Sequence, residues 1–184
     1  MSDAARHATP DELEAGLDQL RAAPRDEGVV ELIVRRPSED AREVVEEAEL
    51  DLVDGLVGDN WLARGRSGGR PANPDAQLTV MNVRATALIA GDRARWPLAG
   101  DQLYVELDLS DEHLPPGTRL AVGSAVIEVT AEPHTGCAKF SERFGLDALK
   151  FVNSPAGSAL NARGINARVV QAGTVRVGDA IRRL

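Results

Sequence analysis

The sequence predicts a mainly β fold, in which a barrel or sandwich-like core carries a few short helices at its edges. Runs of alternating apolar residues, such as Leu103 to Leu109, are typical of half-buried strands. Glycine-containing turns separate these runs, and Gly123-Ser124 has the form of a hairpin turn. Aromatic residues make up only 3% of the chain, so the core must be built mainly from aliphatic side chains.

The N-terminal part of the chain predicts a helix from Pro10 to Arg21. Thr9 can cap this helix, proline suits its first position, and Glu12 completes a capping box. Apolar residues then follow at helical spacing: Leu13, Leu17 and Leu20. We therefore expect residues 1–27 to form a tail with a short helix, and residues 28–184 to form the barrel domain.

The rest of the chain alternates between β-branched runs, helical stretches and turns. The expected strands cover residues 28–36, 77–83, 103–109, 119–122, 125–130 and 163–170, and residues 175–181 close the chain after a turn. The expected helices cover residues 84–90, 138–144 and 146–151, and glycine follows the first two of them as a stop signal. Residues 38–52 fit either a short helix or an extended segment. Residues 64–74 and 153–162 predict loops, and Asp59 is expected to fix the turn before the first of these.

Composition excludes several classes of protein. A net charge of -8 argues against a general binder of nucleic acid or of anionic membranes. A single cysteine rules out an intrachain disulfide and fits a reducing compartment. The chain has no apolar run long enough to cross a bilayer and no secretory signal pattern, so the expected location is the cytoplasm.

The only cysteine, Cys137, lies where a predicted strand passes into a predicted helix. Pro133 ends the strand, and Gly136 can take a backbone conformation that other residues resist. A helix start, together with the nearby His134 and Lys139, favours the thiolate, which is the form that ligates metals and attacks sulfur. The alternative is a buried cysteine that acts as a small hydrophobic residue.

Four segments of the chain resemble the MOSC family, named for the C-terminal domain of molybdenum cofactor sulfurases. These segments are Gly55-Leu56-Val57-Gly58-Asp59, the stretch from Pro133 to Phe140, the stretch from Arg163 to Val169, and the stretch from Gly173 to Asp179. The segment around Cys137 and the Arg163-Gly164 strand are the more specific parts. The resemblance spans about residues 28–184 and implies a β-barrel with a few short peripheral helices.

The resemblance implies two chemistries for Cys137. His134, which is near it in sequence, could act as its catalytic partner by helping to deprotonate the thiol, or could merely lie at the end of the strand. In the first chemistry, Cys137 carries sulfane sulfur received from a pyridoxal-phosphate-dependent cysteine desulfurase. In the other, its thiolate is the metal ligand for molybdenum in a bound molybdenum cofactor, a Mo-pterin, and the protein reduces N-hydroxylated compounds. The chain has no cysteine cluster for an iron–sulfur centre, so a reductase of this kind needs a separate electron donor.

Further residues are expected to hold the anionic cofactor: Lys139, Arg163, Asn166, Arg168, Thr135 and Arg70. Arginine can bind a phosphate through two parallel hydrogen bonds, and Gly164 lets the backbone approach a ligand closely. The alternative for each charged residue is an ordinary surface ion pair. A metal site built from side chains alone is not expected, because one cysteine and three scattered histidines give no ligand spacing.

One departure from the family pattern bears on the choice of chemistry. Several stand-alone members carry a His-Gly-Gly segment after the Gly-Asp turn, whereas here residues 63–70 contain no histidine. This counts against the reductase alternative more than against the fold. Another class remains open, a non-catalytic module that binds a small anion at the mouth of the barrel. The three arginines of residues 64–70 could close over such an anion as a lid.

Overall fold

The computed structural model describes residues 6–67 and 69–184 of the chain. Its strands are β1 (Glu27–Arg35), β2 (Glu43–Val45), β3 (Glu47–Asp51), β4 (Gly55–Leu56), β5 (Leu78–Asn82), β6 (Leu103–Glu106), β7 (Arg119–Val122), β8 (Ala125–Val129), β9 (Ile165–Gln171), β10 (Gly173–Arg176) and β11 (Ala180–Arg183). Its helices are α1 (Pro10–Ala15), α2 (Leu17–Arg21), α3 (Trp61–Ser67), α4 (Val83–Ala90), α5 (Ala138–Phe144), α6 (Leu146–Val152) and α7 (Pro155–Ala159), with 3-10 helices η1 (Pro74–Ala76) and η2 (Arg93–Ala99).

Seven strands close into a β-barrel in the order β11-β7-β8-β9-β5-β6-β1, and β1 pairs with β11 to complete the ring. β5 and β6 are parallel, and the other neighbours in the ring are antiparallel. β1 is long enough to pair with β11 near its start, with β6 along its middle and with β2 at its end. β10, β3 and β4 form a second, smaller sheet. The mainly β barrel predicted from the sequence is confirmed.

Side chains alternate along the strands, so those on one face fill the interior of the barrel and those on the other face pack against the helices. On β6, Leu103 and Val105 point into the barrel cluster, while Tyr104 packs with the helices. On β5, Val80 points inward and Met81 packs with the helices. Both clusters are aliphatic for the most part, as the low aromatic content predicts. The barrel therefore has one face covered by helices, and this face carries the base of the site described below.

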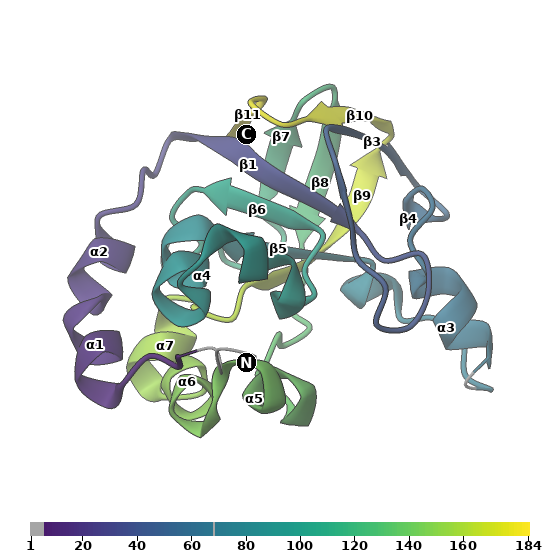
Figure 1. The fold of residues 1–184 in the computed structure, drawn as a ribbon. Coiled ribbons are helices and arrows are strands. Elements are labelled where there is room, and N and C mark those ends of the chain that lie inside the picture. The colour runs from purple at the N-terminus through teal and green to yellow at the C-terminus, as the bar shows by residue number, and fades with distance from the viewer. Residues whose placement is uncertain (1–5, 68) are drawn as a thin grey trace.

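The helices gather on one side of the barrel, except for α3, which lies apart beyond β4 (Figure 1). α1 and α2 contribute buried leucines to the helical cluster, and α1 contacts α6 and α4. The predicted capping box is confirmed, since the Thr9 hydroxyl accepts from the Glu12 amide and the Glu12 carboxylate accepts from the Thr9 amide. Gly16, a poor helix former, divides the predicted helix into two. The proposed division of the chain at residue 28 stays a prediction.

Two predicted loops contain helices. Residues 61–67 form α3, because the Asp59 carboxylate accepts from the Trp61 amide at 3.0 Å and buried Trp61 anchors the first turn. Gly68 lies outside the described residues. Within 153–162, Ser154 caps α7 by accepting from the Gly157 amide at 3.0 Å. The ambiguous residues 38–52 are extended, since they contain β2 and β3, and β6 ends three residues before the predicted end.

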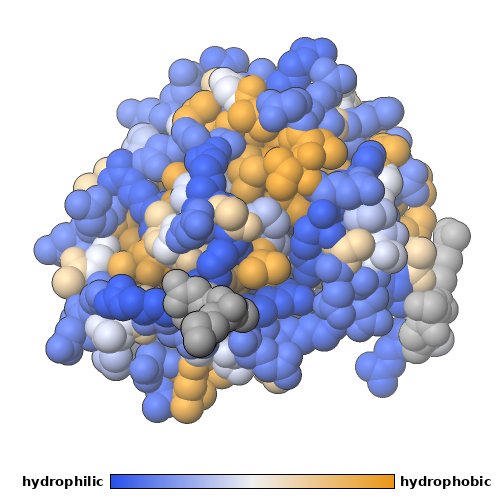
Figure 2. All heavy atoms as spheres, viewed as in Figure 1, coloured by the Kyte–Doolittle hydropathy of each residue, from blue (hydrophilic) through white to orange (hydrophobic). Residues whose placement is uncertain are grey.

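The face seen in Figure 1 is polar over the helices and carries an apolar area over the barrel strands (Figure 2). Among the described residues, no helix combines the length and the apolar character needed to cross a membrane.

Candidate functional site

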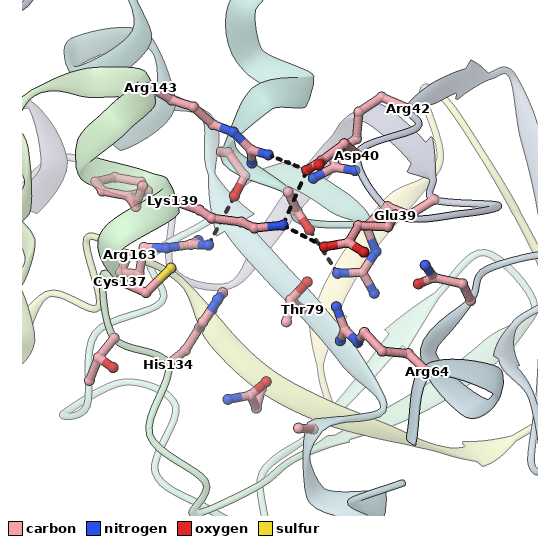
Figure 3. Close-up of a pocket in the computed structure, with 18 of the residues that line it drawn as sticks. Glu39, Asp40, Arg42, Arg64, Thr79, His134, Cys137, Lys139, Arg143 and Arg163 are labelled. Atoms are coloured by element: carbon pink, nitrogen blue, oxygen red, sulfur yellow. Dashed lines mark hydrogen bonds and ion pairs between the residues drawn. The ribbon is translucent and has the colours of Figure 1, made fainter. Parts of the chain in front are cut away.

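A cavity of about 840 Å³ opens beside the barrel. Its walls come from the turn after β1, from α3, from the segment between β8 and α5, and from the start of β9 (Figure 3). Among the described side chains, six cations line it: Arg36, Arg42, Arg64, Lys139, Arg143 and Arg163. The lining also contains the carboxylates Glu39, Asp40 and Glu132, so the cations outnumber the acids at this cavity in a protein of net charge -8.

Cys137 lies on the wall of this cavity. It is the N-cap residue of α5, and its thiol is exposed and in no disulfide. The alternative of a buried cysteine is therefore wrong. The strand-to-helix placement predicted from the sequence is confirmed, with α5 beginning at Ala138 as expected.

The segment between β8 and α5 is held in place by backbone contacts from two sides. Asn166 on β9 donates from Nδ2 to the Glu132 carbonyl at 3.1 Å, and the Gly136 amide donates to Asn153 Oδ1 at 3.0 Å. The sequence predicted that Gly136 takes a backbone conformation that other residues resist, and this is wrong, because its φ is not in the left-handed region. Glycine is needed here for space, since a Cβ would meet the Leu149 side chain at 2.6 Å. The segment also walls a smaller cavity of about 280 Å³.

A buried group of three side chains supports the base of the cavity. Arg163 donates from Nη1 to Asp101 Oδ2 at 2.6 Å and from Nη2 to the Ala99 carbonyl at 2.9 Å. Its guanidinium lies over the Phe140 ring, 5.0 Å from the centroid. His134 Nδ1 is 3.5 Å from Asp101 Oδ1, and neither atom has a hydrogen-bond partner among the described residues. Gly164 has φ +109° and lies so close to the site that a Cβ would meet His134 Nδ1 at 3.1 Å.

His134 is neutral at physiological pH. Burial, and after it the positive charge of Arg163, lower the pKa of its imidazole to about 3, and the Asp101 carboxylate offsets only part of this shift. A ring with so low a pKa is a weak proton acceptor, which counts against His134 as the base for Cys137. That role stays a prediction. The environment of His134 favours a neutral hydrogen-bonding group facing the cavity.

Arg36 is fixed on the opposite wall by Asp59. Two nitrogens of Arg36 donate to the two Asp59 oxygens, each at 2.8 Å, and a third nitrogen donates to the Gly100 carbonyl at 2.8 Å. Asp59 also accepts from the backbone amides of Arg36 and Trp61. The structural role predicted for Asp59 is confirmed, because its carboxylate joins the end of β1 to the start of α3.

Lys139 and Arg143, one turn apart on α5, are paired with carboxylates of the turn after β1 (Figure 3). Lys139 Nζ lies 3.0 Å from Glu39 Oε1 and 3.3 Å from Asp40 Oδ1, and Arg143 Nη2 lies 3.1 Å from Asp40 Oδ1. These carboxylates raise the pKa of Lys139. Burial, together with the charges of Arg143 and Arg36, lowers the pKa of the Arg42 guanidinium.

The structure brings together most of the residues predicted to form the site. Cys137, His134, Thr135, Lys139, Arg163 and Asn166 all line the cavity. Arg168 does not line it, and its guanidinium instead contacts Glu128 at 2.7 Å and Asp75 at 3.4 Å. Arg70 is exposed beyond α3 and does not line the cavity either, whereas Arg64 on α3 does.

Sequence reasoning missed Arg36, Arg42, Arg143 and Asp101. A local signal existed for Arg143, which follows Lys139 by four residues and so shares its face of the helix. Arg36 and Arg42 reach the cavity, and Asp101 reaches Arg163 beneath it, only through contacts between distant parts of the chain, which leave no local pattern. Among the described residues, no group of three His, Cys, Asp or Glu side chains could hold a metal ion.

Solved structures share this fold. The YuaD protein from Bacillus subtilis is 20% identical and superposes with a TM-score of 0.59 over 84% of this chain and 94% of its own. YiiM from Escherichia coli is 18% identical, with a TM-score of 0.54 over 85% of this chain and 69% of its own. YiiM from Geobacillus stearothermophilus is 14% identical, with a TM-score of 0.58 over 85% of this chain and 75% of its own. At these identities the likeness concerns the fold alone.

No curated protein matches the sequence significantly. The model of the MOSC domain matches residues 44–182, which include the cysteine segment, the Arg163-Gly164 strand and the turns at Gly58-Asp59 and Gly178-Asp179. The chain therefore belongs to the MOSC domain family, which is associated with binding of the molybdenum cofactor.

Proposed function

We propose that the chain binds the molybdenum cofactor, or handles the sulfur destined for it, through the thiolate of Cys137. The observation that carries this proposal is the position of Cys137, which lies exposed on the wall of a cavity lined by six cations. A soft thiolate suits both molybdenum and sulfane sulfur, and the cations suit an anionic pterin.

The residues of the cavity fit such a cofactor. A volume of about 840 Å³ lies within the range of small-molecule sites. Asn60 Oδ1 and His134 Nδ1 are buried and have no hydrogen-bond partner among the described residues, so both can serve a polar ring system. Arg163 and Arg36 present guanidinium groups in fixed positions on two walls, because the buried carboxylates of Asp101 and Asp59 hold them in place while offsetting their charge.

Each residue then has a role toward the cofactor, which when bound supplies a redox-active metal. Cys137 is the residue that would ligate molybdenum. Lys139 and Arg163 offset the negative charge of the phosphate, and Asn166 and Thr135 fix the wall against which the pterin lies. In this arrangement the protein either reduces N-hydroxylated compounds, with electrons from a separate reductase, or holds the cofactor for another protein.

Sulfur carriage is the second form of the proposal, and the exposure of Cys137 favours it, because a partner's persulfide can reach the thiol. The Cys137 thiolate would attack the outer sulfur of a persulfide on a pyridoxal-phosphate-dependent cysteine desulfurase. The sulfur–sulfur bond of the donor breaks, the donor cysteine leaves as a thiolate, and Cys137 carries the new persulfide. No external oxidant or reductant is needed for this transfer.

The test uses protein purified from a host that makes the cofactor. Metal ligation predicts molybdenum by elemental analysis and pterin fluorescence in the wild type, and loss of molybdenum in Cys137→Ser. Lys139→Gln should retain less cofactor. Lys150→Gln, which changes the only other lysine of the chain, exposed on α6, should retain as much as the wild type.

Sulfur carriage predicts a different result from the same protein. After incubation with a cysteine desulfurase and cysteine, mass spectrometry should show one added sulfur on Cys137 and none in Cys137→Ser. Protein that neither retains molybdenum nor accepts sulfur would refute both forms and leave a non-catalytic anion-binding module.

A further inference from the structure

The turn between β1 and β2 places two carboxylates against the cations of α5. Glu39 and Asp40 lie about a hundred residues before Lys139 and Arg143, and contact them at 3.0 to 3.3 Å across the cavity. Figure 3 shows both carboxylates pointing from one wall towards the two cations on the other. The contacts belong to the cavity itself, because all four side chains line it.

The backbone of the turn is set to aim one of these carboxylates. Asp40 has φ +58°, in the left-handed region that residues other than glycine seldom adopt. Aspartate tolerates this conformation better than most residues, and here it directs Oδ1 to both Lys139 and Arg143. Within the turn, the Ala41 amide donates to the Ser38 carbonyl at 3.2 Å.

The contacts across the cavity are solvent-accessible. The Glu39 side chain is 82% exposed, that of Asp40 63% and that of Lys139 52%, whereas that of Arg143 is 22% exposed. Ion pairs at such exposure are weak and exchange readily with other charged groups. Arg42 lies beside them and donates to the Ala41 carbonyl at 2.7 Å, so the same turn also engages a third cation of the cavity.

We propose that Glu39 and Asp40 are internal stand-ins for a phosphate-class oxyanion, and that this anion binds Lys139, Arg143 and Arg42 only when the turn of residues 38–41 releases them. A phosphate brings two charges and several oxygens to one place, whereas the two carboxylates offer one charge each from a turn that must hold Asp40 in the left-handed region. The anion therefore displaces the carboxylates, and they lower its apparent affinity by competing for the same cations.

Because of this competition, the cavity prefers anions with several charged oxygens over small monovalent anions, a preference that positive charge alone would not produce. A small monovalent anion engages one cation at a time and leaves the internal pairs intact. An anion with several charged oxygens engages all three cations together and moves the turn away. The inference rests on the proposed function only for the identity of the natural anion, since any phosphate-class ligand would meet the same competition.

The experiment measures binding of inorganic pyrophosphate by isothermal titration calorimetry. Relative to the wild type, the double variant Glu39→Gln with Asp40→Asn should bind pyrophosphate at least tenfold more tightly. Adding Lys139→Gln and Arg143→Gln to that variant should abolish the gain. Chloride in place of pyrophosphate should show no difference between the wild type and the double variant.

A matched control removes the same two charges elsewhere. Glu46 and Glu49 are exposed and do not line the cavity, so Glu46→Gln with Glu49→Gln should leave pyrophosphate affinity within twofold of the wild type. The inference is overturned if Glu39→Gln with Asp40→Asn gains no affinity, or if the control gains as much. Either result leaves molybdenum retention and persulfide formation on Cys137 untouched, so the two proposals fail separately.

Discussion

Two kinds of ion pair surround the same cavity, and they differ in how deeply their carboxylates are buried. Asp59 and Asp101 have no exposed side-chain surface and hold Arg36 and Arg163 in fixed positions. Glu39 and Asp40 are exposed and hold the α5 cations weakly. The comparison shows that burial of the acid, rather than the presence of a pair, separates a scaffold from a contact that a ligand can replace.

The largest expected effect lies on the buried side. Asp101→Ala leaves the guanidinium of Arg163 buried without its carboxylate, so the free energy of unfolding should fall by about 3–5 kcal/mol. Urea unfolding followed by circular dichroism measures this change. A fall of less than 1 kcal/mol would mean that the two kinds of pair do not differ as their burial indicates.

The next effect is the pH dependence of the free energy of unfolding that comes from His134, which lies beside the buried Arg163–Asp101 pair. The folded-state pKa of about 3 lies below the ordinary value of 6.5, so as pH falls the unfolded chain takes up this proton first. The contribution of His134 to stability is unchanged above pH 7 and is lost as pH falls from about 6.5 to about 3. At pH 5.5 the loss should be about 1.4 kcal/mol relative to pH 8.

Comparison with His134→Gln isolates this contribution. The difference in unfolding free energy between pH 8 and pH 5.5 should be smaller in the variant by about that amount. Equal pH dependence in the two proteins would show that the imidazole is protonated in the folded state.

The smallest effect is expected on the exposed side. A double-mutant cycle between Asp40→Asn and Arg143→Gln should give a coupling energy below about 1 kcal/mol, which decreases as salt is added. Asparagine also tolerates the left-handed conformation of Asp40, so the substitution removes charge without adding backbone strain. A coupling above 2 kcal/mol that resists salt would place this pair with the buried ones and would weaken the case for displacement by an anion.

Local signals in the sequence predicted most of the fold. The capping box at Thr9, the strands on either side of Gly123-Ser124 and the start of α5 at Ala138 all follow from patterns a few residues long. The helix α3 was missed because glycine and arginine masked it, and because its N-terminus depends on Asp59 and on the burial of Trp61. Residues 38–52 give an ambiguous local pattern because β2 pairs with β1 over only three residues, and because β3 pairs with β10, which lies far along the chain.

Site residues that belong to a family motif could be predicted from the sequence. Residues whose position depends on a contact with a distant part of the chain could not. Cys137 and Lys139 are on one short segment, and the Arg163 strand is a motif of its own. Asp101 looks from the sequence like one more Gly-Asp turn, yet it is the buried partner of Arg163. Arg168 shares a strand face with Asn166, as expected, but nearby carboxylates at Glu128 and Asp75 hold it outside the cavity.

The pairing of β1 with β11 has a consequence for how the protein is made. Gly28 lies opposite Ile181, so the ring joins segments that leave the ribosome more than 150 residues apart. Until β11 is synthesised, one edge of β1 and one edge of β7 stay without their partners. Unpaired edges attract other strands, and contacts so distant in sequence form slowly. These two edges are therefore open to pairing with other strands until β11 closes the ring.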